Sequence, residues 1–259
     1  MFLYTAYYMD TTILCIQFRK NGRASDLEQK SIRRGIDVHI SLVFVSALDQ
    51  AIVWNNPEVL LSLYNGVILG GSGDFDFDGN REQNDPAREM SYQLLEQLRP
   101  TFRYIFEHDI PTLGICFGHQ IIGAFRGVTV RSDIKQKKIK SHAVILCESA
   151  KTLPIFEDVS LTFTAQYIHT DVLSAVPQGA TLLGEGGESC RISVLRYKNN
   201  IYSTQFHPEL NVSDMALRAA SFPGYLPEGV TVEEIFEEGE DANKILRNFG
   251  RLVDKFSCI

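Results

Sequence analysis

The sequence has little of what marks disulfide-linked or zinc-binding proteins. It contains five cysteines in 259 residues, and these are widely spaced without a C-x-x-C pair. An odd number of isolated cysteines indicates neither a disulfide framework nor a zinc site. We therefore expect a protein of a reducing compartment.

The chain also lacks an excess of positive charge and a long hydrophobic run. Its formal net charge is -7 and its pI is about 5.4, whereas a protein that binds a nucleic-acid backbone concentrates basic residues on one surface. The apolar segment 1–9 has no basic start and ends at Asp10, so it is too short for a signal peptide or a membrane span. We predict a cytoplasmic protein that binds neither nucleic acid nor membrane.

Apolar strands and helices alternate along the first part of the sequence. The expected strands are 12–18, 40–45 and 65–70, and the expected helices are 25–34, 57–63 and 85–99, with Pro100 interrupting the last before a second helical segment to Glu107. This alternation predicts an α/β fold with an open, doubly wound, mostly parallel sheet flanked by helices. With 44% hydrophobic residues, the chain fits one large domain, 1–259.

The segment 110–120, with the sequence IPTLGICFGHQ, predicts a buried strand that runs into a tight turn with Cys116 at its apex. In this pattern Gly114 and Gly118 allow strand and helix to approach closely around a strained residue. The helix N-terminus favours the thiolate of Cys116, and the N–H of Phe117 is placed to donate to a developing oxyanion. Cys116 is therefore a candidate nucleophile, although a buried cysteine in a Gly-flanked turn fits the same letters.

A second segment, 201–209, predicts a strand that ends in His207, followed by Pro208 and Glu209. A nucleophilic cysteine needs a base within hydrogen-bonding reach, and the base needs a third group that fixes its tautomer. Cys116, His207 and Glu209 supply these three parts. Together they favour a catalytic triad over a histidine that merely ends a strand.

These two segments resemble the marks of the class I glutamine amidotransferase family, and the likeness is closest to the amidotransferase half of GMP synthase. The resemblance covers about residues 13–209 and the last helix. It implies a flavodoxin-like fold, a core of about 12–209, no cofactor, and glutamine or another γ-glutamyl amide as substrate. It also implies that residues 211–240 exceed the minimal family domain, and we interpret them as a lid or partner-facing insertion.

The resemblance assigns further site residues by position. The loop Gly70-Gly71-Ser72-Gly73 would supply the second oxyanion donor, Gly73, beside Phe117, although the choice between Gly71 and Gly73 is open because many relatives have Gly-Gly-Pro here. The expected substrate-binding residues are Gly71, Gln120, His169, Thr170 and Asp171, with Thr170 in place of the family's glycine. His119 is expected to be structural.

Two charged segments and the C-terminus complete the pattern. Residues 74–85 imitate a calcium-loop spacing, but position twelve is Asp85 instead of Glu and no helix precedes the loop, so we expect a solvated acidic loop and no metal site. The basic run 131–140 is expected to be a solvated hairpin face, with docking to an acidic partner as the alternative. An amphipathic helix, 241–256, should pack on the sheet through an apolar face that runs from Ala242 to Phe256.

The leading interpretation is an amidotransferase-type hydrolase that releases ammonia from glutamine through a γ-glutamyl thioester. No nucleotide-binding motif follows Glu209, so a synthetase partner would be a separate chain. The alternative is a γ-glutamyl hydrolase or peptidase that acts on larger γ-glutamyl amides. An inactive regulatory subunit is disfavoured by the intact triad and Gln120, and the related intracellular protease branch by Phe117, because that branch has histidine at this position.

Overall fold

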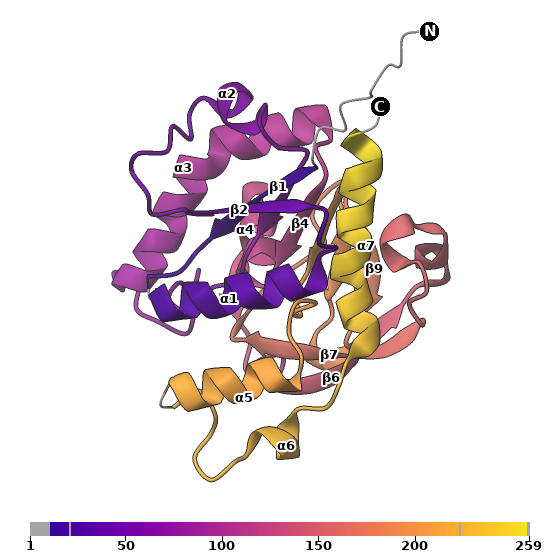
Figure 1. Cartoon of the computed structure of the whole chain (residues 1–259). Coiled ribbons are helices and arrows are strands. Elements are labelled where there is room, and N and C mark those ends of the chain that lie inside the picture. Colours follow the sequence, from indigo (N-terminus) through magenta and orange to yellow (C-terminus); the bar gives the residue numbers. More distant parts are fainter. Residues whose placement is uncertain (1–10, 21, 223, 258–259) are drawn as a thin grey trace, which may run out of the picture.

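The computed structural model describes residues 11–20, 22–222 and 224–257 (Figure 1). The apolar segment 1–9, expected to be neither a signal peptide nor a membrane span, and Cys258 lie outside this range. Within it, no helix is long and apolar enough to span a membrane, and the four described cysteines are free thiols. The cytoplasmic location stays a prediction.

One large sheet organises the described residues, with the strand order β2-β1-β3-β4-β11-β10-β9-β6-β7. The strands from β2 to β11 in this order are parallel, and β10, β9, β6 and β7 extend the sheet in antiparallel fashion. The first six strands in the chain are β1 Thr12–Gln17, β2 Ser41–Ser46, β3 Gly66–Leu69, β4 Thr112–Ile115, β5 Val130–Ser132 and β6 Lys138–Leu146. The remaining strands are β7 Thr162–His169, β8 Asp171–Leu173, β9 Thr181–Glu185, β10 Val194–Arg196 and β11 Ile201–Thr204. Strands β5 and β8 form a separate small sheet.

The helices lie between and after these strands. The α-helices are α1 Gly22–Gly35, α2 Pro57–Leu61, α3 Pro86–His108, α4 Phe117–Phe125, α5 Val212–Ser221, α6 Val232–Ile235 and α7 Glu240–Ser257. Short 3-10 turns are η1 Glu148–Thr152, η2 Pro154–Phe156 and η3 Gly187–Ser189. The alternation of parallel strands and helices confirms the predicted fold class.

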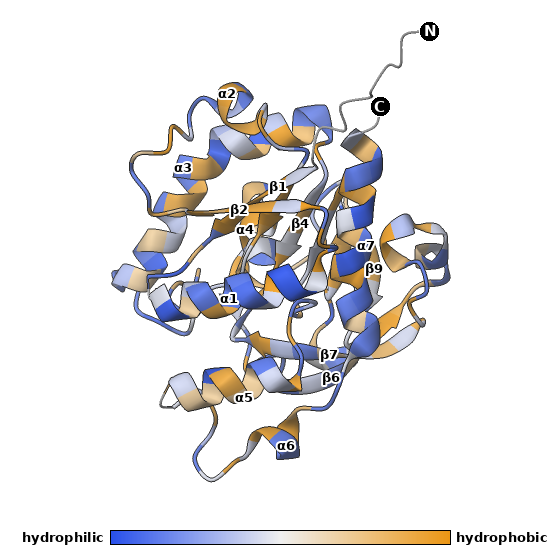
Figure 2. Ribbon diagram, in the orientation of Figure 1, coloured by the Kyte–Doolittle hydropathy of each residue, from blue (hydrophilic) through white to orange (hydrophobic). Residues whose placement is uncertain are grey.

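The sheet separates two hydrophobic cores, because successive side chains of a strand point to opposite faces. In β1, Ile13 and Cys15 join the core beneath α1 and α7, whereas Leu14 and Ile16 join the core beneath α3 and α4. In Figure 2, α1 shows mostly polar residues on its outer side and α7 combines polar and apolar stripes. Both faces are thus covered, which explains why the central strands are continuous apolar runs.

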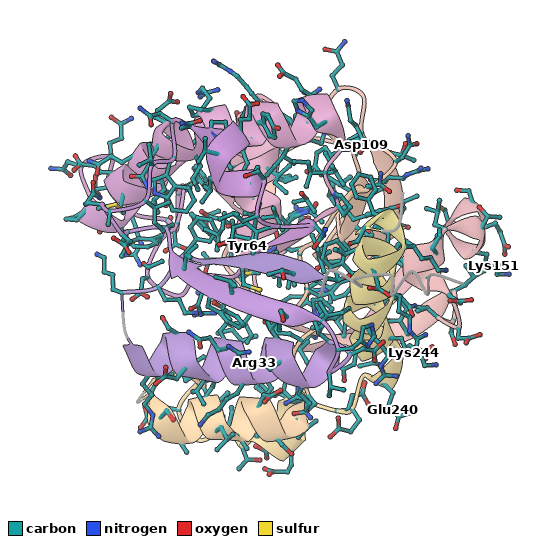
Figure 3. All side chains as sticks on the ribbon, turned by 45° about the horizontal axis from the view of Figure 1, so that its top comes forward. Arg33, Tyr64, Asp109, Lys151, Glu240 and Lys244 are labelled. Atoms are coloured by element: carbon teal, nitrogen blue, oxygen red, sulfur yellow. The ribbon has the colours of Figure 1, made fainter. Side chains whose placement is uncertain are left out.

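The position of β11 beside β4 brings the two predicted catalytic segments together. Thr204 pairs with Ile115 in parallel register, and the N–H of Cys116 donates to the carbonyl oxygen of Thr204 at 2.8 Å. Asp109, at the end of α3 (Figure 3), accepts hydrogen bonds from the N–H groups of Asn199 and Asn200, which form the turn before β11. This anchor fixes the start of β11 next to the start of β4.

Two helix predictions are wrong in detail. Pro100 does not interrupt the helix, because α3 is one element from Pro86 to His108. The proline removes a hydrogen bond to the carbonyl of Glu96, which lies on the exposed side, while Leu98 and Phe102 continue the buried face across it. In α7 the apolar face ends at Val253, since Phe256 is 39% exposed.

The prediction for the basic run 131–140 is also wrong. Its residues do not form one hairpin: β5 pairs with β8, and β6 pairs with β7 and β9. Lys138 is buried, with its ammonium group 4.7 Å from the centre of the Tyr167 ring. Burial lowers the pKa of Lys138 to about 8.

The loop 74–85 and the insertion 211–240 are both anchored to the rest of the fold. In the loop 74–85, Phe75 and Phe77 are buried, and the ring of Phe77 stacks on Phe117 with centroids 5.5 Å apart. In the insertion, Asp214 of α5 forms a salt bridge with Arg34 of α1. Leu210, Met215, Val232 and Phe236 form a small core of their own. A loop that is solvated throughout is therefore excluded for 74–85.

Candidate active site

The strand β4 ends at Ile115, and Cys116 forms the sharp turn into α4. Cys116 has φ 52°, a left-handed conformation that is strained for a residue with a side chain. The N–H of Gly118 donates to the carbonyl of Gly70 at 3.0 Å, which ties the first turn of α4 to the end of β3. The turn therefore holds the cysteine at the carboxyl edge of the sheet, where open α/β folds bind ligands.

Both glycines of the motif are required by close packing. A Cβ at Gly114 would lie 2.7 Å from the carbonyl oxygen of Gly118, and a Cβ at Gly118 would lie 2.2 Å from that of Leu69. These distances are shorter than carbon and oxygen atoms tolerate without a bond. The pattern Gly114-x-Cys116-x-Gly118 thus follows from the approach of α4 to β3 and β4.

His207 and Glu209 follow β11 and lie next to this turn. The Nδ1 atom of His207 and Oε1 of Glu209 are 2.7 Å apart, and both side chains are buried. The N–H of His207 donates to the carbonyl of Gln166 at 2.9 Å, which anchors the segment to β7. With its Nδ1 engaged by Glu209, the imidazole has Nε2 available for a second group.

The electrostatics of the pair favour charged forms. Burial by itself lowers the pKa of His207, but the charge of Glu209 and then the Cys116 sulfur outweigh it and raise the pKa to about 10. Burial likewise raises the pKa of Glu209, and the charge and hydrogen bond of His207 outweigh this and lower it. His207 is thus held in its protonated form, with Glu209 ionised beside it. The structure thus brings the three predicted triad residues together.

The predicted oxyanion donors differ in their availability. Phe117 opens α4, so its N–H has no partner within the helix. The N–H of Gly71 donates to Glu28 at 3.1 Å, whereas the N–H of Gly73 has no acceptor among the residues that the structure describes. This favours Gly73 over Gly71 as the second donor.

Most of the residues expected to bind substrate form hydrogen bonds within the protein. Gln120 donates to the backbone carbonyl of Asp171 at 2.8 Å, and the carboxylate of Asp171 accepts from the N–H groups of Asp78 and Gly79. Thr170 links β7 to β8 and is partly exposed. Contact between these residues and a substrate remains a proposal.

Two buried histidines near the site are held neutral. Burial lowers the pKa of His119 to about 3, and its Nδ1 lies 2.7 Å from the hydroxyl oxygen of Ser203. Burial, followed by the charge of Lys138, lowers the pKa of His169 to about 3 as well. A structural role for His119, as expected, fits this environment.

Three charged residues at the site were missed by the sequence interpretation. Glu28 of α1 is fully buried and accepts from Arg19 at 2.9 Å. Arg218 of α5 is 6% exposed and lines a cavity beside His207. Arg19 follows the carboxyl end of β1, and open α/β sheets bind ligands at the carboxyl ends of their strands, so this position was a signal for Arg19. Nothing in the sequence pattern placed Arg218 near His207.

A metal ion has no evident ligand set in the part of the chain that the structure describes. No group of three His, Cys, Asp or Glu side chains is arranged to hold one. In the loop 74–85, Asp76 pairs with Arg81, Asp78 accepts from the N–H of Ser132, and Asp85 caps α3. These carboxylates are occupied by protein donors.

Comparison with known proteins places this geometry in context. The chain is 30% identical over 151 residues to the glutamine-hydrolyzing GMP synthase of Wolbachia sp. subsp. Brugia malayi, a match of 58% of this chain and 27% of that protein. It is 29% identical over 185 residues to one subunit of the glutamine-hydrolyzing GMP synthase of Methanosphaera stadtmanae, a match of 71% of this chain and 76% of that protein. The crystal structure of a glutamine amidotransferase from Thermotoga maritima has a similar fold, with a TM-score of 0.65 at 16% identity over 95% of this chain and 94% of that one.

The match therefore spans 27% of the length of the Wolbachia relative, and 76% of the Methanosphaera relative. The family description "Glutamine amidotransferase class-I" matches residues 32–219. This range takes in the turn at Cys116, the segment with His207 and Glu209, and the first part of α5. The resemblance seen in the sequence is confirmed, and the chain belongs to the class I glutamine amidotransferase family.

Proposed function

We propose that this chain hydrolyses the side-chain amide of glutamine or of another γ-glutamyl amide, with Cys116 as nucleophile, His207 as proton carrier and Glu209 as the group that orients His207. The observation that carries the proposal is the 2.7 Å contact of His207 and Glu209 beside a cysteine held at positive φ. Membership of an enzyme family that acts on glutamine supports it.

The first chemical step forms an acyl intermediate. The sulfur of Cys116 attacks the side-chain carbonyl carbon, a C–S bond forms, and the C–N bond breaks as the leaving nitrogen takes a proton from His207. A γ-glutamyl thioester remains on the protein. His207 then takes a proton from water, the hydroxide oxygen attacks the thioester, and glutamate leaves as the thiolate returns. One amide and one water give one glutamate and one amine.

The N–H groups of Phe117 and Gly73 would stabilise the oxyanion of both tetrahedral intermediates. They are fixed donors on a helix start and a glycine loop, so they need no rearrangement during the reaction. One donor of this kind contributes about 2.7 to 4 kcal/mol to the transition state. Gly71, Gln120, His169, Thr170 and Asp171 would form the wall that holds the γ-glutamyl group.

A separate acceptor protein is the partner that we propose for glutamine hydrolysis. The Methanosphaera relative, 76% of which is matched, is named as one subunit of a GMP synthase, and a protein so named implies a second component. The net charge of -7 favours a basic surface on the partner, so the association should weaken as salt rises. Ammonia release that is unchanged by candidate synthetase chains would count against this partner.

Labelling and turnover test the proposed chemistry together. Wild-type protein should release glutamate from γ-glutamyl amides and be labelled by a glutamine-like electrophile, and Cys116→Ala should lose both. Cys147→Ala is the matched control, because Cys147 is exposed and lies far along the chain from the α4 turn. Labelling that persists in Cys116→Ala and disappears in Cys147→Ala would overturn the assignment.

A further inference from the structure

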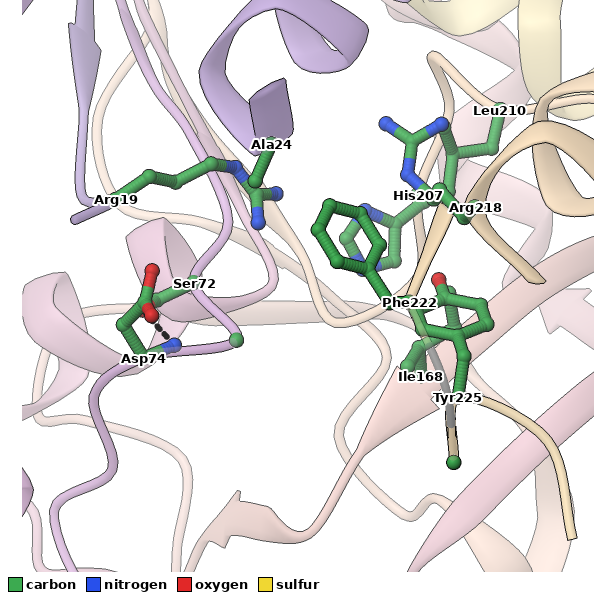
Figure 4. Close-up of a pocket in the computed structure, with 12 residues that line it drawn as sticks. Arg19, Ala24, Ser72, Asp74, Ile168, His207, Leu210, Arg218, Phe222 and Tyr225 are labelled. Carbon is green, nitrogen blue, oxygen red and sulfur yellow. Dashed lines mark hydrogen bonds between the residues drawn. The ribbon is translucent and has the colours of Figure 1, made fainter. Parts of the chain in front are cut away.

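A cavity of about 320 Å³ opens beside His207. Its walls come from the loop after β3, from the end of β1 and from α5 with the segment that follows, including Arg19, Gly73, His207, Arg218, Phe222 and Tyr225. Figure 4 shows Arg19 reaching toward His207 from one side, with Arg218 and Tyr225 on the other. Cys116 is 3% exposed and does not line this cavity.

Arg218 is the most unusual group in the wall. The residue is only 6% exposed, and its Nη2 atom has no hydrogen-bond acceptor in the described chain. Its other contacts are long: Nη1 lies 3.5 Å from the hydroxyl oxygen of Ser31 and 3.4 Å from the carbonyl of Asp214. A buried guanidinium group without a paired carboxylate is costly, and an anion in the cavity would compensate it.

The other basic groups around the cavity already have carboxylate partners. Arg19 pairs with Glu28 at 2.9 Å, and His207 pairs with Glu209. Glu209 also feels the charge of Arg218, but no ion pair within 4.0 Å joins them among the described residues. Asp74 lies across the cavity from Arg218 in Figure 4, and its carboxylate accepts a hydrogen bond from the backbone N–H of Lys20. Arg218 is therefore a basic group of this wall that has no carboxylate partner within 4.0 Å among the described residues.

The position of the cavity identifies which part of a substrate it would hold. In the proposed reaction His207 gives its proton to the leaving nitrogen, so the atoms beyond the scissile bond lie on the His207 side. With glutamine the leaving group is ammonia, which occupies about 30 Å³, as water does. The cavity is far larger, and Phe222 and Tyr225 give it apolar walls.

We infer that this cavity is the leaving-group site for an amine that carries a carboxylate, so that the substrates include γ-glutamyl amino acids, and that Arg218 binds the carboxylate. The inference rests on the proposed function and specifies its substrate class. Tyr225 adds a hydroxyl group and Arg19 a second guanidinium group within the same walls.

The test compares two substrates that differ only in this charge, γ-glutamylglycine and γ-glutamylglycinamide. Glutamate release by wild-type protein should favour γ-glutamylglycine by about tenfold or more in kcat/KM, the range expected for a hydrogen bond to a charged group. Arg218→Gln should remove the preference, mainly by raising KM for γ-glutamylglycine. Arg103→Gln, on the exposed side of α3, is the control and should keep it.

The other outcomes are decisive as well. Equal hydrolysis of the two substrates by wild-type protein would overturn the inference and leave the proposed function standing. If Arg218→Gln lowered kcat/KM equally for both substrates and for glutamine, Arg218 would act on Glu209 or on the carboxylate of the γ-glutamyl group that all three substrates share. This outcome would also overturn the inference. If Arg218→Gln does not fold, Arg218→Lys replaces it and should retain a reduced preference. No hydrolysis of any of the three substrates, with no labelling of Cys116, would overturn the proposed function itself.

Discussion

Replacing Gly118 with alanine tests whether the nucleophile turn depends on the close approach of α4 to β3. A Cβ at this position would lie 2.2 Å from the carbonyl oxygen of Leu69 and 2.9 Å from its carbonyl carbon. Close contacts between carbon and oxygen are about 3.3 Å, so α4 must move by about 1 Å. Overpacking of this kind costs about 1 to 3 kcal/mol of unfolding free energy, and a displacement of about 1 Å at a reacting group costs about 10²-fold in rate.

Urea unfolding and glutamate release measure these two effects on the same protein. Gly118→Ala should lose about 1 to 3 kcal/mol of unfolding free energy and about 10²-fold in kcat/KM. Gly22→Ala is the control, because no atom lies within 4 Å of a Cβ there, and its unfolding free energy should change by less than about 1 kcal/mol. If Gly118→Ala kept wild-type stability and turnover, the argument from close packing would be refuted.

Three further predictions concern the charged groups. Glu209→Gln should keep the fold, as measured by circular dichroism, and lower kcat by about 10²- to 10⁴-fold, because it removes the charge that orients His207. Near-normal turnover would remove Glu209 from the mechanism. Lys138→Met should raise the unfolding free energy at pH 7 by about 1 kcal/mol, since it replaces a buried ammonium by an apolar group of similar length. The control Lys135→Met, on the exposed surface, should change the unfolding free energy little. A loss of stability in Lys138→Met would contradict this reasoning. The difference in unfolding free energy between wild-type protein and Glu209→Gln should be greatest between about pH 4.5 and 6.5 and should fall as the pH rises toward 10. Urea unfolding of both proteins across this pH range measures it.

The sequence was sufficient for the parts of the site that depend on local pattern and strand order. The motif around Cys116 requires its glycines for steric reasons that hold in any protein with this turn, so its conformation follows from the letters. A parallel sheet brings the carboxyl ends of neighbouring strands to one edge. The loop after β3, Cys116 and His207 therefore lie at the same edge, because β3, β4 and β11 are neighbours.

The missed residues depend on how distant segments pack. Arg218 reaches the His207 side only because α5 folds back and Asp214 binds Arg34, which also donates to the carbonyl of Glu209 at 2.7 Å. No periodicity in residues 211–240 encodes that long-range contact. The environment of Lys138 was mispredicted for a related reason: the charge run suggested solvent, but this first residue of β6 pairs with His169 at the inner end of β7 and is covered.

The pH dependence of stability follows from the directions in which the two pKa values of the pair move. His207 has a folded pKa of about 10 against an ordinary value of 6.5, so its contribution is fully present below pH 6.5 and is lost as the pH rises through about 10. Glu209 has a lowered pKa, so its contribution is present above its ordinary value of 4.5 and is lost as the pH falls through its folded value. Both contributions are therefore complete only between pH 4.5 and 6.5.

Other groups titrate over the same range with the opposite sign, which is why the variant is needed as a reference. Lys138 has a pKa lowered to about 8, so its buried charge costs stability below that pH and the cost disappears as the pH rises. Subtracting the profile of Glu209→Gln removes such groups and leaves the pair. If the difference between the two profiles were flat from pH 6.5 to about 10, His207 would be neutral in the resting protein, and the ion pair of protonated His207 with Glu209 would have to be abandoned.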